Sequence, residues 1–86
     1  MILFLRDKDD NNIVDCETFT SDGKVKVKLS IPKSWQHSVE LAEFKTKCDT
    51  LDGVSASDDA QDTVINTLRN QLKKIAVKTN LSYQED

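Results

Sequence analysis

The sequence contains few of the residues on which most catalytic and metal-binding sites depend. Its 86 residues include one histidine, two cysteines and two glycines. The glycines, Gly23 and Gly53, stand too far apart to build a glycine-rich phosphate-binding loop. One histidine, His37, with two separate cysteines does not supply the clustered ligands of a zinc site or a recognisable nucleophile and base. We therefore predict a protein that is not an enzyme and needs no cofactor.

Long apolar runs are also missing. The apolar segment near the start, residues 2–5, is too short for a signal peptide or a membrane span. Cys16 and Cys48 are too few for the disulfide framework of a secreted domain. We interpret both as reduced residues that fill the core, with one disulfide between them as the alternative. These features predict a cytoplasmic protein with no membrane contact.

Basic residues are mostly lysine, and acidic residues are mostly aspartate. Ten lysines against two arginines is a bias typical of AT-rich genomes, and it indicates a bacterial or phage origin. The formal net charge of −3 is too small to argue for or against a charged partner. The aspartates gather in two segments, residues 7–15 and 49–62.

Hydrophobic periodicity predicts three strands followed by two helices. Strands are expected over residues 1–5, 13–20 and 24–31, and the third alternates lysine with apolar residues at a period of two. The sequence Ser21-Asp22-Gly23 favours a tight hairpin turn before it. A helix is expected from Pro32 or Ser34 to about residue 51, and a second begins after a cap at Ser57.

The predicted fold class is α+β. We expect a single domain over residues 1–81, in which two amphipathic helices pack on one face of a three-stranded antiparallel meander. Residues 82–86 are expected to be a frayed tail. The core is expected to join the third strand to the second helix, with two aromatic residues at its edge: Val25, Val27, Leu29 and Ile31 against Leu68, Leu72 and Ile75, closed by Trp35 and Phe44.

The first strand carries apolar side chains on both faces. Two helices can cover only one face of a sheet, so the other must be covered by a tail, a second subunit or a partner. An alternative is that this strand is central and is masked by lysine stems from its neighbour. We interpret the four apolar residues of the strand as a protein interface: Ile2, Leu3, Phe4 and Leu5.

Two further segments suggest ligands. Lys24, Lys26 and Lys28 share one face of the third strand, where a row of ammonium groups could follow a phosphate backbone. No aromatic residue interleaves them for base stacking, so nucleic acid is the less favoured partner and a solvated sheet face is the simpler interpretation.

The second segment is residues 7–18. Asp7, Asp9 and Asn11 match the first three ligand positions of an EF-hand calcium loop, and Asp15 matches the ninth. The segment therefore resembles that loop, and the resemblance implies oxygen ligands for a hard cation. Asn12 stands where the loop has its glycine, and no helix precedes it. We interpret the segment as a polar hairpin turn, with weak cation binding as the alternative.

Together these features predict a small protein-interaction module, namely an adaptor, assembly factor or inhibitor. It would bind a protein partner, or form a homodimer, through residues 2–5. The alternatives are a nucleic-acid-binding protein that uses the lysine face and an acidic inhibitor that mimics DNA. The last requires the two aspartate-rich segments to converge on one surface.

Overall fold

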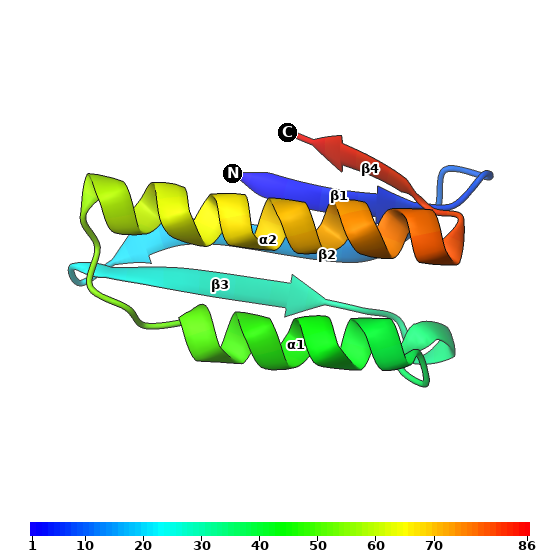
Figure 1. Ribbon diagram of the computed structural model, residues 1–86, viewed down its shortest axis with the longest axis horizontal. Coiled ribbons are helices and arrows are strands. Elements are labelled where there is room, and N and C mark those ends of the chain that lie inside the picture. Colours follow the sequence, from blue (N-terminus) through cyan, green and yellow to red (C-terminus); the bar gives the residue numbers. More distant parts are fainter.

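A computed structural model describes all of residues 1–86 (Figure 1). The chain forms four strands, one 3₁₀ turn and two α-helices: β1 (Ile2–Arg6), β2 (Asn12–Ser21), β3 (Lys24–Ser30), η1 (Lys33–Trp35), α1 (Val39–Leu51), α2 (Asp58–Thr79) and β4 (Ser82–Glu85). The α+β class and the order of three strands followed by two helices are confirmed.

The sheet has four strands rather than the predicted three. The strand order is β3-β2-β1-β4, and every pairing is antiparallel. The expected frayed tail is wrong, because residues 82–85 form β4 and pair with β1. Asn80 takes the left-handed conformation at the end of α2 (φ 58°) and returns the chain to the sheet. As a result, β1 is an inner strand and β3 is an edge strand.

Local signals in the sequence account for most element boundaries. Asp22 and Gly23 both have positive φ, 54° and 72°, which is the tight hairpin turn expected there. The Ser57 hydroxyl accepts a hydrogen bond from the N–H of Ala60 at 3.1 Å, so the predicted cap of α2 is confirmed. The first helix begins later than predicted, at Val39, because Ser38 provides its cap and η1 intervenes.

Both helices lie on one face of the sheet, but each covers a different part of it. α2 packs against β1 and β4, whereas α1 packs against β3. Figure 1 shows α1 running alongside β3 at the bottom of the view. The apolar residues of β3 belong to the same core as Leu68, Leu72 and Ile75 of α2, as predicted, but the helix that runs beside β3 is α1. The short connection through η1 returns the chain directly beside the strand that it has just left.

The core between the two layers contains 15 buried apolar residues. Leu3, Leu5, Leu68 and Leu72 at its centre are completely enclosed. The apolar side chains of β3 are enclosed only at Val25, and those further along the strand are partly exposed. The edge of the sheet beside α1 therefore keeps an accessible apolar surface.

Candidate binding groove

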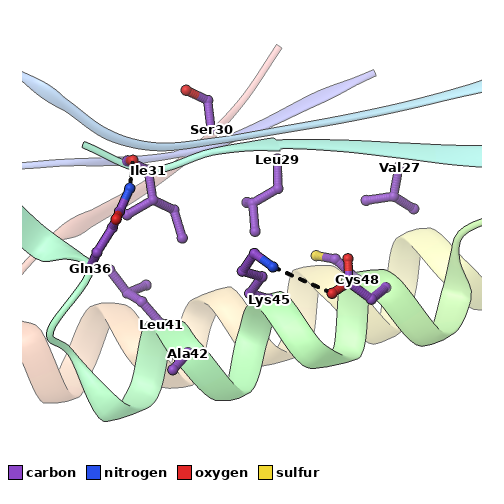
Figure 2. Close-up of a pocket in the computed structure, with 10 residues that line it drawn as sticks. Val27, Leu29, Ser30, Ile31, Gln36, Leu41, Ala42, Lys45 and Cys48 are labelled. Atoms are coloured by element: carbon purple, nitrogen blue, oxygen red, sulfur yellow. Dashed lines mark hydrogen bonds and ion pairs between the residues drawn. The ribbon is translucent and has the colours of Figure 1, made fainter. Parts of the chain in front are cut away.

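The largest concavity of the molecule lies between β3 and α1, with a volume of about 540 Å³. Its apolar lining comes from both elements: Val27, Leu29, Ile31, Leu41, Ala42 and Cys48. Figure 2 shows the side chains of β3 hanging from the strand toward the helix, while Ser30 points to the other side of the sheet. We call this concavity the β3–α1 groove.

Polar side chains stand around the apolar lining. The Lys45 Nζ atom lies 3.6 Å from Asp49 Oδ2, and both side chains are about two-thirds exposed. Such an exposed ion pair adds little stability, so both charges are free to turn toward a ligand. At the other end of the groove, Gln36 Nε2 donates a hydrogen bond to the carbonyl of Ile31 at 3.2 Å. The groove is therefore apolar along its length and polar at its margins.

The wall formed by β3 is a strand edge with unpaired backbone groups. Val25 donates its N–H to Val54 O at 2.8 Å and accepts at its carbonyl from Gly53 N–H at 2.7 Å, both on the side away from β2. Because hydrogen-bonding direction alternates along an antiparallel strand, Val27 and Leu29 also direct their backbone groups away from β2. No strand, loop or side chain of the protein bonds the N–H or the carbonyl of Leu29.

The thiol at the floor of the groove is inert. Cys16 and Cys48 are both free and buried, with 0% and 3% of their surfaces exposed. A hydrogen bond with Cys16, together with burial, raises the pKa of the Cys48 thiol. A protonated thiol is a poor nucleophile, so Cys48 contributes packing to the groove rather than reactivity. The two residues fill the core as expected.

The four residues predicted as an interface are divided between the two faces of the sheet. Leu3 and Leu5 are completely buried beneath the helices. Ile2 and Phe4 are half-buried on the opposite face. Only these last two are therefore placed to contact a partner on the outer face.

That outer face is more polar than the sequence of β1 suggests. Asp15 and Glu17 of β2 pair with Phe4 and Ile2 across the strands. The guanidinium carbon of Arg6 lies 5.2 Å from the centroid of the Phe4 ring. β1 is thus an inner strand whose outer apolar atoms are partly masked by charged neighbours: Arg6 lies over Phe4, and Lys28 lines the same hollow as Ile2 and Phe4.

The three lysines of β3 lie on the outer face of the sheet, as their alternation predicts. Glu17 pairs with Lys28 across the strands, so a carboxylate stands beside the lysine row. The other lysine group is carried by the last turns of α2 on the opposite, helical face: Lys73, Lys74 and Lys78. The structure therefore does not join the two groups into one basic surface.

The loop between β1 and β2 uses its polar side chains to close a turn. The Asp7 carboxylate accepts hydrogen bonds from the backbone N–H groups of Asp9 and Asn11 at 2.9 and 2.8 Å, and from the Asn11 side chain at 3.1 Å. These bonds, chiefly those from Asn11, lower the pKa of the Asp7 carboxyl. Asp15 lies on β2 and accepts from Asn12 instead. No three His, Cys, Asp or Glu side chains anywhere in the molecule converge into a metal-binding group.

The two aspartate-rich segments lie at opposite ends of the molecule. Figure 1 shows the β1–β2 loop at the right of the view and the connection between α1 and α2 at the left, along an axis 37 Å long. These two loops therefore do not form the single acidic surface that DNA mimicry requires.

The groove was not predicted from the sequence, because its two walls meet only in the folded chain. Gln36, Ala42 and Lys45 carry no motif that marks them as contact residues. The available signal was a small residue, Ala42, within an apolar helix stripe; in the structure it is exposed and lines the groove beside the strand.

Neither helix is both long and apolar enough to cross a membrane. Comparison of the chain with protein-family models, with curated proteins and with solved structures gave no match.

Proposed function

We propose that this protein is a small, non-enzymatic binding module that holds a protein partner in the β3–α1 groove, and so acts as an adaptor, assembly factor or inhibitor. The observation that carries the proposal is an apolar groove of about 540 Å³ whose wall is an unpaired strand edge. A peptide chain can pack its own apolar side chains against this lining and can form hydrogen bonds with the free backbone groups.

The groove suits a partner better than the outer face of β1 does. The hollow on that face has a volume of about 220 Å³, and its apolar lining consists of Ile2 and Phe4. Arg6 already covers part of the Phe4 ring. In the groove, by contrast, Val27, Leu29 and Ile31 stay partly exposed and form a continuous apolar lining with Leu41, Ala42 and Cys48. Self-association through Ile2 and Phe4 is the second candidate, and light scattering tests it.

The proposal can be tested by selecting peptides from a random display library on the purified full chain. Selected peptides would then be titrated into isotope-labelled protein and followed by NMR. We expect the shifted backbone amides to belong to residues 27–31 and 36–49. Shifts confined to the outer face of β1, or failure to select any peptide, would contradict the proposal.

A substitution within the groove provides the matched test. Ala42 is exposed on α1, so Ala42→Arg should fill the groove while the protein keeps its melting temperature. Binding of the selected peptides should then be lost. Val77→Arg is the control, because Val77 is 81% exposed on α2 and lies outside the groove. An equal loss of peptide binding in both variants would show that the groove is not the binding site.

A further inference from the structure

We infer that the partner enters the groove as an extended segment of alternating apolar and acidic residues, which joins the sheet as a fifth strand on the free edge of β3. The inference rests on the proposed function and names the kind of partner that the same groove accepts.

The open part of the β3 edge has a defined length. At its start, the connection after α1 already bonds Val25 and forms a bridge between Ser55 and Lys24. The Asp52 carboxylate then accepts a hydrogen bond from the N–H of Val27 at 2.9 Å. At its end, Gln36 bonds the carbonyl of Ile31. The stretch from Val27 to Ile31 stays open, which is about 16 Å and room for about five partner residues.

The free backbone groups within this stretch are those that a neighbouring strand uses. They are the carbonyl of Val27, the N–H and carbonyl of Leu29, and the N–H of Ile31. Solvent reaches them because β3 is the last strand on its side of the sheet. A partner backbone can pair with all four without displacing any element of the protein.

Side chains on one face of the added strand would enter the groove. α1 packs below β3 (Figure 2), and its exposed residues Ala42, Lys45 and Asp49 line the groove next to the free edge of that strand. Leu29 of β3 and Ile31, which follows the strand, line that space from above, and the small Ala42 lines it from the helix, below Ile31 (Figure 2). Alternate residues of the partner would therefore need to be apolar.

Side chains on the other face of the added strand would lie beside lysines. Lys26 and Lys28 stand on the outer face of the open stretch, where the next strand's outward residues become their cross-strand neighbours. Lys28 has a carboxylate, Glu17, on its β2 side only. Acidic residues at the outward positions of the partner would place negative charges beside Lys26 and Lys28 on the side of β3 that faces away from β2.

The same lysines argue against a second copy of this chain as the occupant. Pairing of β3 with another β3 would bring two lysine rows together on one face, and like charges in neighbouring strands destabilise a sheet. The lysines therefore disfavour pairing of β3 with a second β3, and they still allow an acidic strand to pair with it.

The inference can be tested with two synthetic peptides titrated into the full-length protein. One alternates valine with glutamate, and the other has lysine in place of glutamate. We expect the glutamate peptide to bind in the groove and to slow hydrogen exchange at the Leu29 amide. The lysine peptide should bind at least about tenfold more weakly, because two attractive cross-strand pairs become repulsive.

Charge reversal on the protein supplies the matched variants. Lys26→Glu combined with Lys28→Glu should reverse the preference between the two peptides. Lys24→Glu should leave it unchanged, because Ser55 already covers that part of the edge. Equal binding of both peptides, or a preference that survives the double reversal, overturns the inference. Self-association of the protein that prevents both peptides from binding also overturns the inference, because a second copy of the chain would then occupy the β3 edge.

The outcomes separate this inference from the proposed function. If library-selected peptides bind the groove without slowing exchange at Leu29, the groove is a binding site but strand addition is wrong. If no peptide of any kind reaches the groove, the proposed function fails as well.

Discussion

At the scale of single residues, strict alternation along β1 decides which leucines belong to the core. Leu3 has no exposed surface, whereas its neighbour Phe4 is half-buried on the outer face. Leu3→Lys should destabilise the protein by more than about 3 kcal/mol, because it removes a packed side chain and buries a charge. Phe4→Lys should leave the protein folded. Urea unfolding of both variants checks the prediction, and a more damaging change at Phe4 would contradict the assigned register.

Tyr83 offers a second prediction at this scale, because it is the only tyrosine in the chain. Burial, with a hydrogen bond from its hydroxyl to Glu85 at 2.8 Å, raises the pKa of Tyr83 from 10.0 to about 12. The folded state holds this proton more tightly than the unfolded state. The resulting stability is fully present below pH 10 and is lost as the pH rises through about 12.

Absorbance of the phenolate measures this titration directly. We expect a midpoint near pH 12. Relative to Tyr83→Phe, which lacks the titrating group, the unmodified protein should lose stability between pH 10 and 12. A midpoint at 10.0, the ordinary value, would mean that β4 leaves the tyrosine fully solvated.

At the scale of elements, β4 is held by side chains as well as by its ladder with β1. Glu85 forms an ion pair with Arg69 of α2, and Lys73 lies 5.6 Å from the centroid of the Tyr83 ring. Deleting residues 82–86 should therefore lower the melting temperature. It should also expose a β1 edge that promotes self-association as protein concentration rises.

Light scattering and thermal melting of the truncated protein measure both effects. The substitution Gln84→Ala, at an exposed position of the same strand, is the control and should change neither. A truncated protein that melts and scatters like the full chain would show that these residues contribute nothing to the sheet.

The elements with strong local signals were the ones predicted correctly. The lysine alternation of β3 and the turn at Asp22 and Gly23 each depend on neighbouring residues alone. The same holds for the Ser57 cap and the apolar stripe of α2. β4 was missed because four residues with one aromatic carry almost no periodic signal, and their strand conformation depends on β1, which is distant in sequence.

At the scale of the whole molecule, the pairing of helices with strands was not predictable from local pattern. Both helices are amphipathic, and sequence alone does not say that α1 covers β3 while α2 covers β1 and β4. The groove follows from that arrangement, because α1 packs against the edge strand β3 and the groove lies between these two elements. The predicted interface at residues 2–5 depended on β1 lying uncovered, and the unexpected β4 made it an inner strand.

The order of the strands also determines on which side of the sheet residues 1 and 86 lie. Residues 2 and 86 bond each other twice, Ile2 N–H to Asp86 O at 3.4 Å and Asp86 N–H to Ile2 O at 2.9 Å. Both ends thus emerge at the β1–β4 side, about 14 Å across the sheet from the β3 edge. A tag, a solid support or a fused protein joined at either end would therefore lie on the β1–β4 side of the sheet. The β3–α1 groove, on the other side, would stay accessible to a partner.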